Sequence, residues 1–258
     1  MFEPIFVFLF GACLGSFAGL LVYRVPKKLS IVRPASHCTQ CKAKLPWYMN
    51  IPIFSCLFLR ARCKFCKACF GWRHFFIELL MAIGLLALYW RFGISPLGIE
   101  YAIFYFGLIT ISFIDLELRI IPDVFSIGGI IIGLIGAALN PDRAFLDALM
   151  GVLLGGGVFW LIAYAYYKLR GAMGLGGGDI KLLAWIGSVL GLSAILPVIF
   201  ISSLLGSFVG IFLMIKNRSG MATSLAFGPF LSLSAIMYLF FHEELARLFY
   251  SFFVPGLL

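Results

Sequence analysis

Long apolar runs recur along nearly the whole chain, and this feature most constrains what the chain can fold into. The hydrocarbon core of a bilayer is about 30 Å thick and needs roughly 20 apolar residues per helix. Of the 258 residues, 62% are hydrophobic and 12% are charged, whereas soluble domains are about half apolar and a quarter charged. A single buried core could not take up so many apolar side chains. The sequence therefore predicts an all-α polytopic membrane protein.

The apolar runs are separated by charged residues and by Gly and Pro, and they predict about eight transmembrane helices. They cover residues 4–22, 74–91, 97–115, 124–139, 147–168, 180–193, 195–215 and 226–249. The run 180–193 is short for a full span, so it could be tilted, re-entrant or fused with its neighbour near Pro197. Residues 1–22 lack a basic start and a small-residue cleavage site, so we expect a retained first helix rather than a signal peptide.

The basic residues are unevenly placed along the chain. The net charge is +9, and 11 of the 20 Lys and Arg residues lie between Tyr23 and Arg73, where there is no Asp or Glu. A basic loop beside an apolar helix is typical of a cytoplasmic loop that faces anionic lipid. We therefore expect membrane lipid, and no nucleic acid, as the partner of this charge. The chain then divides into a first transmembrane helix (1–22), a cytoplasmic basic loop (23–73) and a membrane-embedded domain (74–258).

The basic loop contains two C-x-x-C pairs, Cys38/Cys41 and Cys63/Cys66, which are separated by 21 residues. Two such pairs can place four thiolates around one Zn²⁺ ion, and four protein ligands leave no open position. The sequence therefore predicts a structural zinc site. Cys69 offers Cys66/Cys69 as an alternative pair. We expect Cys13 and Cys56 to be small buried side chains rather than ligands. His37 and His74 flank the loop and are not expected to bind the metal, although His37 could substitute as a ligand.

Two aspartates lie at the ends of apolar helices. The predicted topology places both of these helix ends on the same side of the membrane. Asp115 ends the run 101–114, and Asp179 follows the glycine-rich segment 174–178. An ionisable residue inside an apolar helix costs about 2.5–3.5 kcal/mol on insertion scales and usually has a function. Two neighbouring carboxylates can share one proton, so one acts as a base for water and the other as an acid for a carbonyl oxygen. The alternative is that both aspartates only cap helices, as we expect for Asp123.

These residues resemble the type IV prepilin peptidases, which are membrane aspartyl proteases of the GxGD type. The resemblance lies in the segments Ile114-Asp115, Ile121-Pro122-Asp123, Gly176 to Ala184, Gly15-Ser16-Phe17, Tyr23-Arg24, Asn50-Ile51-Pro52 and Phe227-Gly228-Pro229, together with the cysteine pairs. It implies that Asp115 and Asp179 are the catalytic pair. It also favours Cys63/Cys66 over Cys66/Cys69.

The resemblance further implies a bacterial inner-membrane enzyme of type IV pilus or type II secretion systems. Its substrates would be prepilin or pseudopilin precursors that carry a short basic leader, a Gly before the scissile bond and an apolar helix after it. Many members also N-methylate the new N-terminus with S-adenosylmethionine. Where the family often has Gly-Ser-Phe-Leu-Asn, this chain reads Gly15-Ser16-Phe17-Ala18-Gly19, which weakens the methylation expectation.

Two other classes of protein share some of these features. An ion-coupled transporter would also have intramembrane acids, broken helices and a metal-binding loop, but its acids would be expected towards mid-membrane. A non-catalytic assembly protein of a secretion machine would tolerate the loss of either aspartate.

Overall fold

A computed structural model describes residues 2–33, 37–38, 40–44, 46–58, 62–68, 72–171, 176–217 and 225–253. The chain divides into two compact units, Met1–Thr110 and Ile111–Leu258. The regular structure of the described residues is helical, and these residues form no β-strand. One isolated β-bridge joins His37 and Lys44. The all-α prediction is therefore confirmed.

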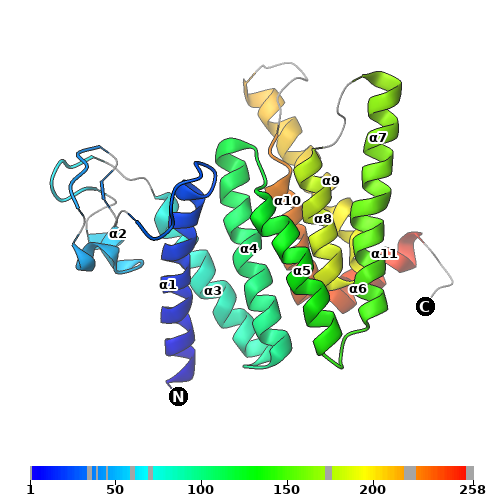
Figure 1. The fold of residues 1–258 in the computed structure, drawn as a ribbon, viewed down its shortest axis with the longest axis horizontal. Helices are drawn as coiled ribbons and strands as arrows, with labels where there is room; N and C mark the ends of the chain where they lie inside the picture. Colours follow the sequence, from blue (N-terminus) through cyan, green and yellow to red (C-terminus); the bar gives the residue numbers. More distant parts are fainter. Residues whose placement is uncertain are drawn as a thin grey trace. The chain divides into compact units, whose positions relative to one another are not determined.

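The first unit is built on two long helices, α1 (Glu3–Arg24) and α3 (Arg73–Phe92), which run side by side (Figure 1). Small residues on α1 allow this close approach. A Cβ atom on Gly11 would lie 2.8 Å from Cα of Ala82, and one on Gly15 would lie 2.5 Å from Cα of Glu78. Glycines at a spacing of four residues let two membrane helices pack backbone to backbone.

The rest of the first unit is the loop between these helices and the start of α4. The loop contains a 3-10 turn, η1 (Trp47–Asn50), and the short helix α2 (Phe54–Phe58). Helix α4 (Pro96–Leu118) begins in the first unit and ends in the second. The hydroxyl of Tyr105 on α4 donates a hydrogen bond of 2.9 Å to the carbonyl oxygen of Leu80 on α3.

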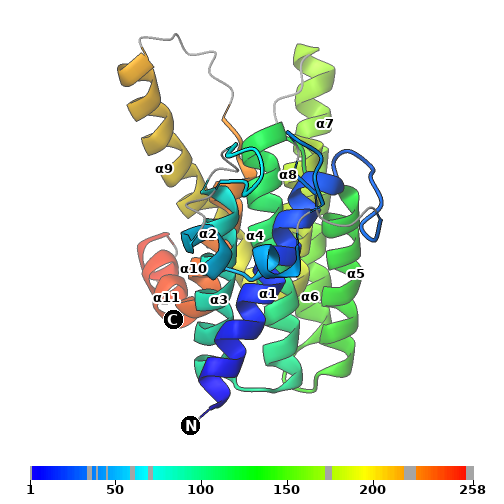
Figure 2. The ribbon, with the colours of Figure 1, turned by 90° about the vertical axis from the view of Figure 1, so that its left-hand side faces the viewer.

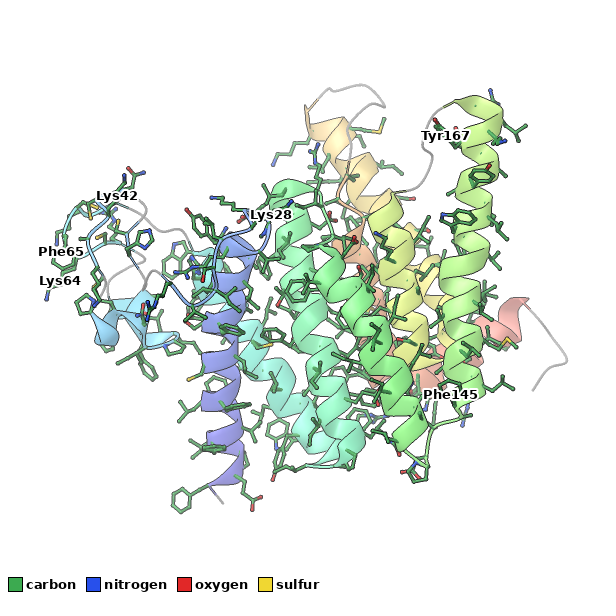
Figure 3. All side chains as sticks on the ribbon, viewed as in Figure 1. Lys28, Lys42, Lys64, Phe65, Phe145 and Tyr167 are labelled. Atoms are coloured by element: carbon green, nitrogen blue, oxygen red, sulfur yellow. The ribbon has the colours of Figure 1, made fainter. Side chains whose placement is uncertain are left out.

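The second unit is a bundle around α8 (Gly177–Leu190). Its other elements are α5 (Asp123–Leu139), α6 (Phe145–Val152), η2 (Leu153–Val158), α7 (Phe159–Arg170), α9 (Leu192–Asn217), α10 (Gly228–Phe240) and α11 (His242–Phe253). The segment η2 is π-helical and joins α6 to α7 in one rod, with Phe145 and Tyr167 near its opposite ends (Figure 3).

From Leu182 to Val189, helix α8 is almost entirely apolar and is enclosed by its neighbours. Every residue from Leu182 to Val189 is buried. Glycines on α5 and α6 admit this close packing: Gly129 faces the ring of Trp185, and Gly151 meets Gly187 backbone to backbone. A helix that is apolar all round is typically buried in protein. The shortness of the run 180–193 is thus explained by burial inside the bundle, and α8 and α9 are separate helices divided by Gly191, which has φ +82°.

Within the described residues, five helices are long and apolar enough to cross a membrane: Glu3–Arg24, Arg73–Phe92, Pro96–Leu118, Phe145–Arg170 and Leu192–Lys216. The same residues include two shorter apolar helices, Asp123–Leu139 and Gly228–Phe240. The chain is therefore multi-pass, while the full set of about eight spans stays a prediction.

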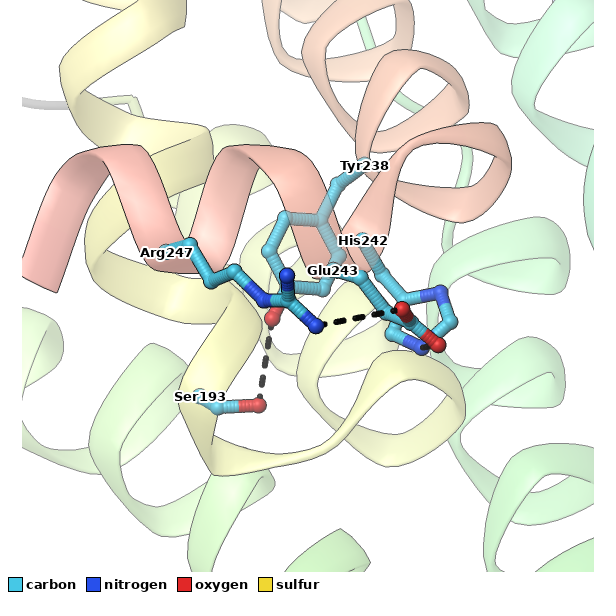
Figure 4. A network of polar contacts seen from close by, with 5 residues as sticks. All are labelled: Ser193, Tyr238, His242, Glu243 and Arg247. Carbon is cyan, nitrogen blue, oxygen red and sulfur yellow. Dashed lines mark hydrogen bonds and ion pairs between the residues drawn. The ribbon is translucent and has the colours of Figure 1, made fainter. Parts of the chain in front are cut away.

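The last expected helix, 226–249, is broken in the structure. Helix α10 ends at Phe240 and α11 begins at His242, running in a different direction (Figure 4). Helix α11 carries charged residues, among them Glu243 and Arg247, whose side chains lie 3.7 Å apart. A helix with charged side chains on one face and apolar ones on the other is suited to a surface rather than to the lipid interior, which explains the break. Figure 2 gives the second view of these helices.

Candidate active site and metal centre

Asp115 lies in the last turn of α4, three residues before the helix ends at Leu118. It is 5% exposed. The backbone N–H of Gly228, the first residue of α10, donates a hydrogen bond of 2.9 Å to its Oδ2 atom. A carboxylate so deeply buried needs such a partner, because an unpaired buried charge is costly. The segment Phe227-Gly228-Pro229 therefore contacts Asp115 directly, although the two segments are far apart in the sequence.

Asp179 lies in the first turn of α8, where Gly176 is the residue before the helix. Its carboxylate folds back over that residue, because a Cβ atom on Gly176 would lie 2.7 Å from Asp179 Oδ2. Because Gly176 has no side chain, the carboxylate occupies space that a larger residue at position 176 would fill. Asp179 is partly exposed, in contrast to Asp115.

The second unit brings Asp115 and Asp179 near each other. The two carboxylates interact electrostatically. Ile121 packs between the segments that hold them: a Cβ atom on Gly178 would lie 3.0 Å from Ile121 Cβ, and one on Gly228 would lie 3.3 Å from Ile121 Cδ1. Two neighbouring carboxylates, one buried and one partly exposed, can hold a single proton between them. That arrangement supports acid–base chemistry on a bound water molecule.

A salt bridge lies beside this pair. Lys181 Nζ lies 2.6 Å from Asp123 Oδ1 and joins the start of α8 to the start of α5. Asp123 is the first residue of α5, as the sequence predicts. Its link to Lys181 was not predicted, because the spacing of 58 residues carries no periodic signal.

The four predicted metal ligands, Cys38, Cys41, Cys63 and Cys66, lie together in the first unit, with all sulfur atoms within 4.8 Å of one another. The Sγ atoms of Cys38 and Cys66 are 3.7 Å apart, and those of Cys41 and Cys63 are 4.0 Å apart. Zn–S bonds of about 2.3 Å in a tetrahedron place sulfur atoms about 3.8 Å apart. The cluster therefore fits one tetrahedral metal ion. Lys42, Lys64 and Phe65 mark the surrounding loop in Figure 3.

Both halves of the cluster have the same backbone conformation. In the first, Lys42 N–H donates to Cys38 O and Cys38 N–H to Ala43 O; in the second, Lys67 N–H donates to Cys63 O and Cys63 N–H to Ala68 O. Lys42 and Lys67 both have a positive φ, 56° and 60°. The sequence carries a signal for this repeated turn beyond the cysteine spacing, because Cys-x-x-Cys-Lys-Ala occurs at residues 38–43 and again at 63–68.

The turn also prepares a thiolate. The backbone N–H of Cys41 stabilises the Cys38 thiolate and is the main cause that lowers the pKa of Cys38 to about 7. The thiolate is the form that binds metal. The remaining cysteines lie elsewhere: Cys13 is exposed on α1 rather than buried as expected, Cys56 is partly buried on α2, and Cys69 lies outside the described residues.

Glu78 is a further buried carboxylate, and it was not predicted from the sequence. It is 6% exposed on α3, and its Oε2 atom accepts a hydrogen bond of 2.6 Å from the N–H of Ile53 in the cysteine loop. Ile53 has φ +65°, a strained conformation for a β-branched residue. Glu78 therefore anchors the middle of the cysteine loop, between its two C-x-x-C pairs, to α3. The criterion that selected Asp115 and Asp179, an acid within an apolar helix, would have selected Glu78 too.

Family models match both parts of the chain. The bacterial peptidase A24 N-terminal domain matches residues 9–92, and the type IV leader peptidase family matches residues 102–211. A prepilin leader peptidase/N-methyltransferase of Xanthomonas campestris pv. campestris is 32% identical over 91% of this chain and 90% of its own length. The chain belongs to the type IV leader peptidase family. It is accordingly a multi-pass inner-membrane protein.

Other members of the type IV leader peptidase family show the same degree of similarity. A prepilin leader peptidase/N-methyltransferase of Myxococcus xanthus is 36% identical over 85% of this chain and 66% of its own length. One of Neisseria gonorrhoeae is 32% identical over 87% of this chain and 85% of its own length. No solved structure matches this chain. The N-terminal match contains all four clustered cysteines, and the leader-peptidase match contains both aspartates.

Proposed function

We propose that this protein is a membrane aspartyl endopeptidase that removes the leader peptide of type IV prepilin or pseudopilin precursors, with Asp115 and Asp179 as its catalytic pair. The observation that supports the proposal is that the segments holding these two carboxylates pack on the same residue, Ile121, in the second unit of a leader-peptidase family member. The curated relatives are named prepilin leader peptidases, which supports this substrate class.

The proposed chemistry needs no nucleophilic side chain. One carboxylate takes a proton from water, and the water oxygen attacks the scissile carbonyl carbon. The other carboxyl group donates its proton to the carbonyl oxygen, where negative charge develops. A pair that holds one proton in total begins the reaction in the required state.

The location of the site fits a substrate held in the membrane. We propose that the basic loop 23–73 and the active site face the cytoplasm, because the loop carries 11 of the 20 Lys and Arg residues. The precursor's apolar helix then lies in the bilayer with its leader on the cytoplasmic side. Residues 1–22 serve as the first span, and residues 74–258 form the peptidase domain.

The cysteine cluster is proposed to hold a structural Zn²⁺ ion. Cys38, Cys41, Cys63 and Cys66 supply four sulfur ligands at tetrahedral spacing, which leaves no open position for a substrate. Bound zinc would cross-link the two halves of the loop, because each half supplies two of the four sulfur atoms. We further propose N-methylation of the new N-terminus with S-adenosylmethionine as methyl donor, on the strength of the relatives' N-methyltransferase name.

The test is cleavage of a prepilin-like precursor by purified protein, followed by mass measurement of the product. Asp115→Asn and Asp179→Asn should each abolish cleavage, because an amide neither takes nor supplies the proton. Asp142→Asn, in the loop before α6, is the matched control and should cleave normally. Normal processing by either of the first two variants would remove the proposal. It would leave the transporter or the non-catalytic assembly protein, neither of which the family membership favours.

A further inference from the structure

The two carboxylates of the proposed catalytic pair have different surroundings. We propose that the backbone N–H of Gly228 fixes Asp115 as the ionised member, so that Asp115 is the base for water and Asp179 is the acid for the carbonyl oxygen. This assignment rests on the proposed function and deepens it, because similarity to known family members does not say which aspartate is the base and which is the acid. Gly228 acts here as a positioning residue through Asp115.

A buried hydrogen bond joins Gly228 to Asp115. Gly228 N lies 2.9 Å from Asp115 Oδ2, and the contact is buried. A backbone N–H can only donate, and a donor aimed at a carboxyl oxygen favours the charged form. Gly228 is also the first residue of α10, and the free N–H groups at a helix start favour a negative charge.

The two aspartates also differ in the charges that surround them. Burial opposes the charged form of Asp115, and the Gly228 N–H and the positive charge of Arg119, one turn beyond Asp115, act against that effect. Among the described residues, no group donates a hydrogen bond to the Asp179 carboxylate. Lys181 is the nearest cation along α8, and its ammonium group is bound by Asp123 at 2.6 Å. Asp179 therefore faces the negative charge of Asp115 with less compensation, which favours the protonated form.

Position 228 has no room for a side chain. A Cβ atom on Gly228 would lie 2.8 Å from Asp115 Oδ2 and 3.3 Å from Ile121 Cδ1. Ile121 cannot simply retreat, because it also packs against Gly178 on α8. Any side chain at position 228 would thus displace the carboxylate that the N–H holds, so both the donor and the absence of a side chain are needed.

The assignment determines the path of each proton. Asp115 Oδ2 is occupied by Gly228, so Oδ1 takes the proton from water as the water oxygen bonds to the carbonyl carbon. Asp179 gives its proton to the carbonyl oxygen, which forms a neutral tetrahedral intermediate. The C–N bond then breaks as the leaving amine takes the proton from Asp115. Asp179 recovers its proton from the hydroxyl that becomes the carbonyl of the new carboxyl group.

An epoxide can report which carboxyl group is ionised in the unaltered protein. A carboxylate oxygen attacks a ring carbon of 1,2-epoxy-3-(p-nitrophenoxy)propane, the C–O bond opens, and the ring oxygen takes a proton from the neighbouring acid. The product is an ester that peptide mass mapping can locate. The expected ester is on Asp115, at about ten times its level on Asp179. A preference for Asp179 would overturn the assignment, while inactive Asp115→Asn and Asp179→Asn variants would still support the proposed function.

The Gly228→Ala variant tests the cause. The added methyl group should push the Asp115 carboxylate away from the N–H of residue 228 and weaken their hydrogen bond. This loss should lower kcat for precursor cleavage by about 10- to 100-fold, with a smaller change in KM. It should also reduce the preference of the epoxide for Asp115. Gly128→Ala on α5 is the matched control, because a Cβ atom there would have no neighbour within 4 Å. Wild-type kcat together with unchanged labelling in Gly228→Ala would refute the positioning role.

Discussion

Lys181 on α8 forms a salt bridge of 2.6 Å with Asp123 at the start of α5. Lys181 lies two residues after Asp179, and Asp123 lies two residues after Ile121. The pair therefore ties together the two segments that wall the proposed active site. Both side chains are about half exposed, at 42% and 60%. An exposed ion pair contributes about 0–1 kcal/mol to stability, so its expected role is to keep the segments in register rather than to hold the fold.

Removing either charge should slow cleavage without unfolding the protein. We expect Asp123→Asn and Lys181→Met each to lower kcat by about three- to tenfold, because Asp179 loses its fixed position. The exchanged double variant Asp123→Lys/Lys181→Asp should recover part of the rate. Precursor cleavage and thermal unfolding are measured together. A double variant no better than the single ones would show that the pair has no positioning role.

Two neighbouring glycines in the first turn of α8 should respond differently to the same substitution. Gly178→Ala should lower the cleavage rate by about tenfold or more, because its Cβ atom would lie 3.0 Å from Ile121 Cβ and would displace the turn that carries Asp179. Gly177→Ala should cleave at the wild-type rate, because nothing lies within 4 Å of a Cβ atom there. Equal losses in both variants would contradict the packing explanation.

Metal analysis should find about one zinc ion per chain. Serine in place of Cys38, Cys41, Cys63 or Cys66 should remove it, because each supplies one of four ligands. Cys13→Ser is the control, since Cys13 lies on α1 outside the cluster and should leave the zinc content unchanged. A full zinc content in any of the four ligand variants would exclude that residue as a ligand.

Acidification should release the metal. The pKa of Cys38 is lowered from 9.0 to about 7, so its thiolate is available to a metal above that pH and takes up a proton below it. Because protons and Zn²⁺ compete for the same sulfur atoms, the apparent zinc affinity should fall as the pH drops through 7. Competition with a zinc-binding dye between pH 8 and pH 6 measures this. A constant affinity over that range would argue against thiolate ligation.

Glu78→Ala should loosen the cysteine loop. The substitution removes the acceptor that lies 2.6 Å from the Ile53 N–H, and a lost hydrogen bond to a charged group costs about 1.5–3 kcal/mol. Amide hydrogen exchange at Ile53 should therefore become faster. Glu3→Ala is the control, because Glu3 bonds the exposed Tyr89 hydroxyl at the other end of α3. Unchanged exchange at Ile53 would show that Glu78 does not hold the loop.

Several features could be predicted from the sequence because they depend on composition or on short spacing. Apolar length indicated the membrane helices, and their ends fell within a few residues of the observed ones up to α9. The two C-x-x-C pairs identified the four cysteines that meet in space. The break at Phe241 was missed because the apolar residues continue through α11, and only the alternation of charged and apolar side chains marks the change.

The sequence by itself determined that this chain is a multi-pass helical protein with two acids at helix ends and a four-cysteine loop. These properties follow from local hydrophobicity and from neighbours along the chain. Only the tertiary structure decided which backbone group holds Asp115, since Gly228 lies 113 residues away. It likewise placed Ile121 between Gly178 and Gly228. Such contacts arise from the packing of whole helices, and no periodicity in the sequence records which residues meet when they pack.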